Sequence, residues 1–148
     1  MTRIRTVVWA AVAGLSLAAA GAWAAGNPVA DRQAAMKQVA AAMKDGSGYV
    51  SGQTAWDAAK VKTVMTGLSA SSKKAHGLFT AGSDKDPKTA ADPKIWTNRA
   101  DFDKRMNEMA ALATAASKAS SADDFKPKFL ALGATCKGCH DLYRKKKT

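Results

Sequence analysis

The chain has 148 residues, 47% of them hydrophobic, and a formal net charge of +11 from 23 Lys and Arg against 12 Asp and Glu. This length suffices for one domain with a modest core. The lysines are scattered apart from a basic run at 144–147, and no base-reading motif is present, so we expect no nucleic-acid partner and interpret the charge as solubility and steering toward acidic partners.

The N-terminal segment has the order of residues that is typical of a secretory signal peptide. Two arginines give it a basic start, an apolar run follows over 7–20, and Ala22-Trp23-Ala24 supplies small residues for cleavage. The apolar run is shorter than a membrane-spanning helix requires, so cleavage is favoured over a retained membrane anchor. We therefore predict a signal peptide at 1–24, a mature domain at 25–148 without a membrane span, and a periplasmic location.

Beyond this segment, apolar spacing predicts helices and no strands. Four helices are expected, at about 30–44, 54–76, 93–118 and 124–145. Gly46 and Gly48 are expected to end the first helix, and Thr54 to cap the second. The polar segment 80–93 contains two prolines and is expected to be a surface crossover. Amphipathic helices with short connections predict an all-α fold, an antiparallel four-helix bundle.

The last predicted helix carries an apolar seam that includes both cysteines of the chain. Its members recur at helical steps of three and four residues: Phe125, Phe129, Leu132, Cys136, Cys139 and Tyr143. Pro127 is compatible with this helix if it lies in the first turn. The seam predicts that both thiols face the interior of the bundle.

Cys136-Lys137-Gly138-Cys139-His140 is a C-x-x-C-H sequence, the motif of c-type haem attachment. Residues three and four apart share one face of a helix, so the two thiols and the imidazole project together. Two thioether bonds can then form to the vinyl groups along one porphyrin edge, and His140 reaches the iron from the proximal side. Gly138 leaves space where the macrocycle approaches the backbone.

Three other interpretations of the two cysteines are weaker. A thioredoxin-like redox pair belongs beside a βαβ unit, and no strand is predicted. A zinc site needs a fourth ligand, and the only other histidine, His76, is expected at the surface near a helix end. A structural disulfide explains neither the adjacent histidine nor the seam. We therefore expect one covalently bound haem c.

With its haem motif at the C-terminal end of an all-helical chain, the sequence resembles the class II c-type cytochromes, the cytochrome c-prime family. The resemblance covers nearly the whole predicted mature domain. The elements that carry it are 32–36, 78–79, 93–96, Phe102 and 136–144. What the resemblance implies is a four-helix bundle that holds one haem c between its helices, often as a homodimer.

The family divides by what occupies the sixth coordination position of the iron, and the matching residue here is Met36. In high-spin members an apolar residue on the first helix covers a five-coordinate iron, which admits nitric oxide or carbon monoxide. In low-spin relatives a methionine from the same helix binds the iron, and the protein transfers electrons. Position alone makes Met36 a core side chain. The resemblance makes it either the sixth ligand or a lid, and spacing leaves both open.

Two arginines are further candidates for cofactor binding. Arg32 is expected either to pair with a haem propionate or to be solvated on the outer face of its helix. Arg144 lies one turn beyond His140. The resemblance implies that Arg144 borders the proximal pocket, and the alternative is that it belongs only to the basic tail.

These residues predict a periplasmic electron carrier with small, transient redox partners. The alternative is a five-coordinate protein that binds nitric oxide or carbon monoxide. A peroxidase-like enzyme is not expected, because the first helix offers no distal histidine or carboxylate pair.

The exported protein should be coloured and should keep its pigment in acidic acetone. Thioether bonds survive this extraction, whereas haem that is held only by coordination passes into the solvent. The measurement is the visible absorption of the precipitate and of the supernatant. A colourless protein, or a coloured supernatant, would contradict covalent attachment.

Overall fold

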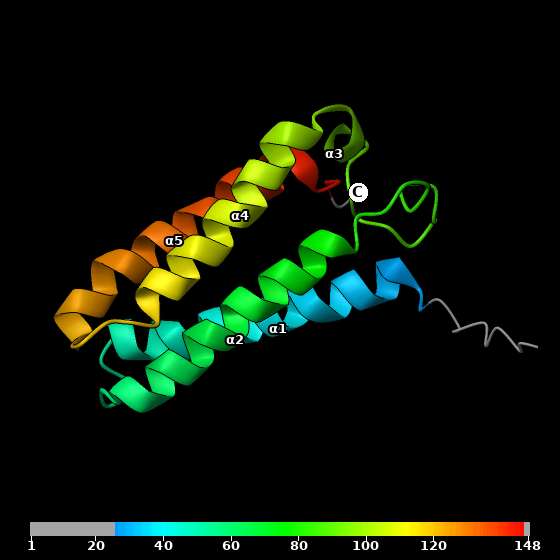
Figure 1. Cartoon of the computed structure of the whole chain (residues 1–148). Helices are drawn as coiled ribbons and strands as arrows, with labels where there is room; N and C mark the ends of the chain where they lie inside the picture. Colours follow the sequence, from blue (N-terminus) through cyan, green and yellow to red (C-terminus); the bar gives the residue numbers. More distant parts are fainter. Residues whose placement is uncertain (1–25, 147–148) are drawn as a thin grey trace, which may run out of the picture.

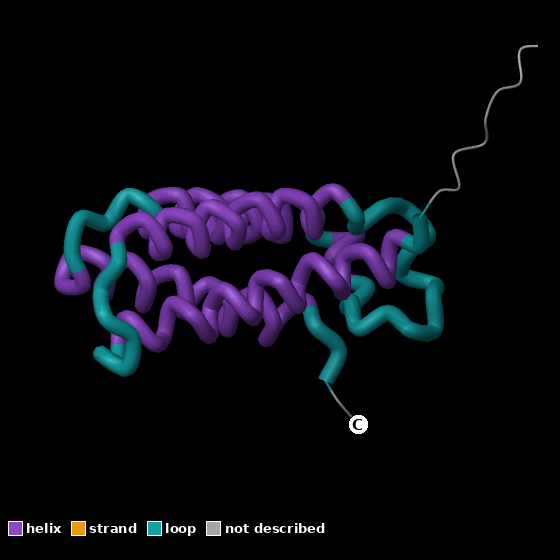
Figure 2. The backbone as a smooth tube through the Cα atoms, turned by 90° about the horizontal axis from the view of Figure 1, so that it is seen from below, coloured by secondary structure: helices purple, strands orange, loops and turns teal. Residues whose placement is uncertain are grey.

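The structure, a computed structural model, describes residues 26–146, so the signal peptide predicted at 1–24 lies outside the described residues. The helices are α1 (Pro28–Val50), α2 (Ala58–Gly77), the short α3 (Lys94–Thr97), α4 (Arg99–Ala116) and α5 (Ala122–Tyr143). Figure 1 shows α1 beside α2 and α4 beside α5, and Figure 2 shows the connecting loops at both ends of the bundle. The predicted all-α four-helix bundle is confirmed. None of the helices within 26–146 is long and apolar enough to cross a membrane.

The first helix does not end at residue 44 as predicted, because α1 continues through Gly46 and Gly48 to Val50. A Cβ atom at Gly46 would lie 2.2 Å from Cε2 of Phe129, so the absence of a side chain lets α1 and α5 approach here. Packing therefore outweighs the low helix propensity of glycine. The predicted cap of the second helix is also wrong, since Asp57 caps α2 by accepting a hydrogen bond from the Lys60 N–H at 3.0 Å.

The predicted third helix is divided at Asn98, whose φ of −122° and ψ of 50° lie outside the helical region. The Asn98 side-chain amide donates to the Tyr143 hydroxyl at 3.0 Å, a partner far away in the sequence. The last helix begins two residues earlier than predicted, so Pro127 lies in its second turn rather than its first. The carbonyl that loses its N–H partner there belongs to Asp123, which is exposed and can bind water instead.

The seam on α5 is buried as predicted. Phe125, Phe129, Leu132 and Tyr143 are at most 6% exposed. Both cysteines are half-buried and pack against the same core cluster. Burial of these large side chains sets the rotation of α5 about its axis, and that rotation points the cysteines inward.

The two ends of the bundle differ. At one end Gly46 and Phe129 bring α1 against α5. Toward the other end, where α1 begins and α5 ends, the two helix pairs diverge (Figure 1). Among neighbouring long helices, α1 and α5 contact each other least.

The C-terminal end of α5 is fastened to α4 by a hydrogen-bonded network around Asp101. Its Oδ2 accepts a hydrogen bond from the Tyr143 hydroxyl at 2.6 Å and another from Arg105 Nε at 2.7 Å. The hydrogen bond from Arg105, followed by that from Tyr143, lowers the pKa of the Asp101 carboxyl. The network holds the last turn of α5 against the bundle.

Replacing Gly46 by alanine should destabilise the haem-loaded protein, because the new methyl group collides with the Phe129 ring. We expect a loss of about 1–3 kcal/mol in the free energy of unfolding, measured by urea denaturation. The matched control is Gly67→Ala, since a Cβ there meets nothing within 4 Å. The control should gain about 0.5–1 kcal/mol from helix propensity. Equal stability of the two variants would contradict the close approach of α1 and α5.

Replacing Asp101 by asparagine should flatten the acid limb of the stability curve. A carboxyl whose pKa is lowered in the folded state stabilises the protein fully above its unfolded pKa, about 3.9. That contribution is lost as pH falls through the lowered, folded-state pKa. The measurement is thermal unfolding of the haem-loaded protein from neutral pH down into this range. Asp45→Asn, an exposed carboxylate at the far end of α1, should leave the acid limb as it is.

Candidate functional site

Cys136 and Cys139 lie on the inner face of the last turns of α5. Both thiols are free and half-buried, so the disulfide interpretation is not supported. Cys136 Sγ is 3.6 Å from the carbonyl oxygen of Leu132, one turn earlier on the helix. The side chains therefore follow the helix surface and remain available for bonds to another group.

Burial raises the pKa of both thiols, so they are neutral at neutral pH. The reactive cysteine of a thioredoxin-like pair has a lowered pKa, and this environment does the opposite. The zinc interpretation finds no support either. No three His, Cys, Asp or Glu side chains gather as a metal-ion site in the part of the chain that the structure describes.

His140 lies one residue beyond Cys139, in the last turn of α5. The residue as a whole is exposed. Partial burial, followed by the positive charge of Arg144, lowers the pKa of the imidazole. Neutral imidazole is the form that binds metals, so this environment favours a ligand. Arg144 also donates its backbone N–H to the His140 carbonyl at 3.2 Å, so the backbone of Arg144 continues directly from the last turn of α5.

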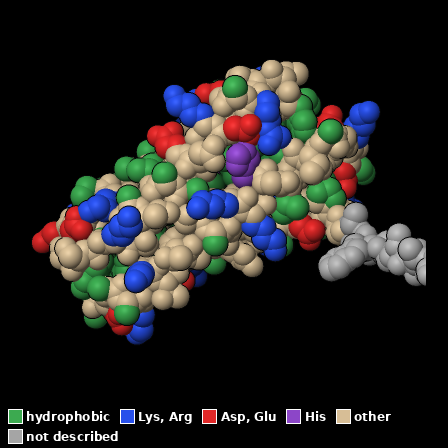
Figure 3. All heavy atoms as spheres, viewed as in Figure 1, with side chains coloured by type: hydrophobic (Ala, Val, Ile, Leu, Met, Phe, Trp, Pro, Cys, Tyr) green, Lys and Arg blue, Asp and Glu red, His purple; other side chains and the backbone are tan. Residues whose placement is uncertain are grey.

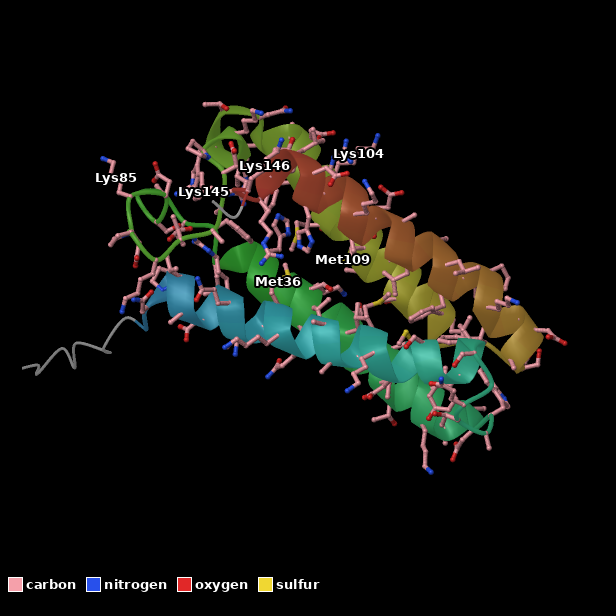
Figure 4. The ribbon with its side chains drawn as sticks, turned by 180° about the vertical axis from the view of Figure 1, so that it is seen from behind. Met36, Lys85, Lys104, Met109, Lys145 and Lys146 are labelled. Atoms are coloured by element: carbon pink, nitrogen blue, oxygen red, sulfur yellow. The ribbon has the colours of Figure 1, made fainter. Side chains whose placement is uncertain are left out.

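Met36 lies on α1, across the diverging end of the bundle from the cysteines. It is half-buried and packs against the core cluster that also contacts Cys136 and Cys139. Figure 4 shows Met36 projecting from α1 into the space between the two helix pairs, where Met109 approaches from α4. The methionine that the sequence singles out thus lies at the same end of the bundle as the C-x-x-C-H motif.

Two alternatives were open for Arg32, a haem propionate partner or a solvated side chain, and the structure contradicts the second. The Arg32 side chain is not solvated on the outer face, because the residue is only 4% exposed. Nη1 donates to the Leu78 carbonyl at 3.3 Å and to Ser83 Oγ at 2.8 Å. Nη2 donates to the Ser83 carbonyl at 3.2 Å and to the Thr89 hydroxyl. All four terminal N–H groups are directed at the 78–89 segment, which leaves only Nε for a haem propionate.

His76 lies in the last turn of α2, near a helix end as the sequence predicts, and is partly buried there. Its Nε2 lies 2.6 Å from Asp103 Oδ1, which also accepts a hydrogen bond from Arg99 Nε at 2.7 Å. Arg99 in turn donates to the Phe79 carbonyl at 2.8 Å. This network joins α2, α4 and the loop, so the role of His76 is structural.

Two neighbours of the motif were missed by sequence reasoning. The charges of Arg105 and Asp101 act on the Cys139 thiol from α4. A Cβ at Gly138 would meet Arg105 Nη1 at 3.7 Å, an ordinary contact distance, so the protein itself does not require glycine there. No periodicity could have indicated these contacts, since the residues lie some 35 positions apart on different helices.

The chemistry of this donor set fits haem c. Two neutral, free thiols stand one turn apart on an inward face, and each can add its S–H across one vinyl group. An imidazole follows directly, and a thioether lies on the facing helix. Haem c supplies an iron that changes between the ferric and ferrous states when it is bound.

Comparison with known proteins identifies the family. The family model described as "Cytochrome C'" matches residues 27–144. The chain is 36% identical to the cytochrome c' of Rhodopseudomonas palustris over 94% of this chain and 97% of that protein. It is 32% identical to the cytochrome c-556 of Agrobacterium fabrum over 98% of both chains.

A solved structure agrees with these sequence matches. A nitric oxide complex of a mutant of cytochrome c prime from Alcaligenes xylosoxidans superimposes with a TM-score of 0.74 at 31% identity. The match covers 82% of this chain and 95% of that one. The family, the bundle and the donor set agree with one another. This chain therefore belongs to the cytochrome c' family and is a haem protein with one covalently attached haem c.

Proposed function

We propose that this chain is a periplasmic electron carrier in which Met36 is the sixth ligand of the haem iron. Cys136 and Cys139 anchor the haem through thioether bonds, and His140 is its proximal ligand. Arg144 borders the proximal side, where its charge favours the neutral imidazole. The helix bundle shields the haem, and a carrier of this kind needs no catalytic side chains.

The observation that carries this proposal is the position of Met36. The side chain is half-buried, contacts the same core cluster as both cysteines, and projects between the helix pairs at their diverging end (Figure 4). A thioether is a competent axial ligand of haem iron. A methionine and a histidine on facing helices can bind the two sides of one haem.

The alternative is a five-coordinate haem protein that binds nitric oxide or carbon monoxide, with Met36 as a lid. One observation favours it: the Alcaligenes relative named above is a nitric oxide complex. A lid and a ligand occupy the same place on α1. The difference between them is whether the sulfur binds the iron or only limits access to it.

The surface charge supports transient association with acidic redox partners. Figure 3 shows Lys and Arg side chains spread over the visible face, with acidic side chains between them. Scattered charge of this kind accelerates encounter without fixing one orientation, and its effect falls with ionic strength. We expect electron exchange with an acidic partner to slow as salt is added.

The absorption spectrum of the reduced protein tests the assignment of Met36. Methionine ligation predicts sharp low-spin bands that carbon monoxide leaves unchanged. Met36→Ala should convert this spectrum to a broad high-spin band that shifts when carbon monoxide is added. The reason is that the variant loses the only sixth ligand that the proposal assigns.

Met43→Ala is the matched control, because Met43 lies two turns further along α1 and packs against the same core. It should keep the low-spin spectrum. A wild-type protein that is already high-spin and binds carbon monoxide would establish the gas-binding alternative. An unchanged low-spin spectrum in Met36→Ala would exclude Met36 as the ligand.

A further inference from the structure

The segment between α2 and α3 is hydrogen-bonded to α1 by the exposed Gln33, whose Nε2 donates to the Lys88 carbonyl at 2.9 Å, and by the buried Arg32. Arg32 is 4% exposed and directs its four terminal N–H groups at oxygens of Leu78, Ser83 and Thr89. Its guanidinium also lies over the Phe79 ring, 4.9 Å from the centroid. Hydrogen bonds from a charged donor are stronger than neutral ones, and a buried guanidinium that lost its acceptors would be costly. The start of α1 is therefore held firmly to this segment.

The same segment is tied to the end of α5 by backbone hydrogen bonds. The Asp92 N–H donates to the Tyr143 carbonyl, and the Lys145 N–H donates to the Ala90 carbonyl, both at 2.9 Å. Ala91 and Arg144 form an antiparallel bridge between these two bonds. Figure 4 shows Lys145 beside the loop that carries Lys85.

Thr89 connects the hydrogen bonds that join this segment to α1 with those that join it to the end of α5. Its hydroxyl oxygen accepts one hydrogen bond from Arg32 Nη2 and another from the Ala91 N–H at 3.1 Å. The residue is 5% exposed, so water does not replace either partner readily. One oxygen atom thus connects the side chain that holds α1 with the residue that pairs with the end of α5.

This connection reaches both candidate iron ligands within one helical turn. Arg32 lies four residues before Met36 on α1, and Arg144 lies four residues after His140. The Arg144 N–H donates to the His140 carbonyl, so the bridge and the last turn of α5 are continuous. Because the two helix pairs diverge at this end (Figure 1) and α1 and α5 make few contacts overall, the hydrogen-bonded segment links the start of α1 to the end of α5.

We propose that Thr89 is a positioning residue that, through Arg32 and Ala91, sets the distance between Met36 and His140. This inference rests on the proposed function and adds a control over the sixth coordination position. Loss of the hydrogen bonds to the Thr89 hydroxyl lets the start of α1 move away from α5. If Met36 is a ligand, it would then dissociate from the iron more often. If it is a lid, it would move away from the distal side of the haem more often. In both cases the distal side of the haem becomes easier to reach.

The test is Thr89→Val in the haem-loaded protein, because valine keeps the shape of the side chain and removes the oxygen. If the wild type is high-spin and binds carbon monoxide, its association rate, measured by stopped flow, should rise about two- to tenfold in the variant, the factor expected for one lost hydrogen bond. If the wild type is low-spin, the high-spin fraction of the variant should rise. Amide hydrogen exchange in the first two turns of α1 should accelerate.

Three variants complete the design. Thr63→Val makes the same chemical change at an exposed threonine on α2, whose hydroxyl bonds only to its own helix at Ala59, and should behave as wild type. Thr89→Ser keeps the oxygen and should also behave as wild type. Ser83→Ala removes a different acceptor of Arg32 and should raise the association rate in the same direction, which provides a test if Thr89→Val does not fold.

Wild-type carbon monoxide kinetics and spin state in both Thr89→Val and Ser83→Ala would overturn the inference. Faster amide hydrogen exchange without any change in carbon monoxide kinetics or spin state would overturn it too, because the Thr89 hydrogen bonds would then stabilise α1 without affecting the haem site. Failure of the proposed function is visible separately in the wild-type protein. A wild type without covalent haem, or one whose spectrum Met36→Ala leaves unchanged, contradicts the function whatever Thr89→Val does.

Discussion

The proposed haem site needs two thiols and an imidazole on one face of a single helix, and the packing of α5 provides that face. The face that α5 turns inward is set by burial of Phe125, Phe129, Leu132 and Tyr143. Cys136 and Cys139 belong to this same face, so the packing that stabilises the bundle also directs the thiols. A rotation of α5 by half a turn would expose the aromatic side chains and carry the motif away from α1.

Different interactions hold α1 and α5 together at the two ends of the bundle. At one end Gly46 permits direct contact with Phe129, and dispersion forces between closely packed atoms hold the helices together. At the other end the helices diverge, and polar groups span the difference through Arg32, Thr89 and the Ala91–Arg144 bridge. At this end a hydrogen-bonded segment, rather than direct helix contact, therefore links α1 to α5.

Local sequence signals predicted which helices exist better than where they end. The first helix was expected to stop before Gly46, but a contact with Phe129, more than 80 positions away, favours its continuation. The third was expected to be continuous, but Asn98 leaves the helix and bonds to Tyr143. In both places a partner from the last helix outweighs a local preference, which for a glycine in a helix is about 1 kcal/mol. Such partners are invisible to periodicity.

The sequence alone determined the chemistry, because C-x-x-C-H on an apolar seam places two thiols and an imidazole together by helical spacing whatever surrounds them. It also singled out Met36 through the family resemblance. Only the tertiary structure decided what Arg32 and His76 do, since their partners lie on other segments: the 78–89 loop for Arg32 and Asp103 for His76. The physical reason is the separation in sequence between the interacting residues. A motif within one turn follows from backbone geometry, whereas a buried hydrogen bond across some 50 residues exists only after the helices have assembled.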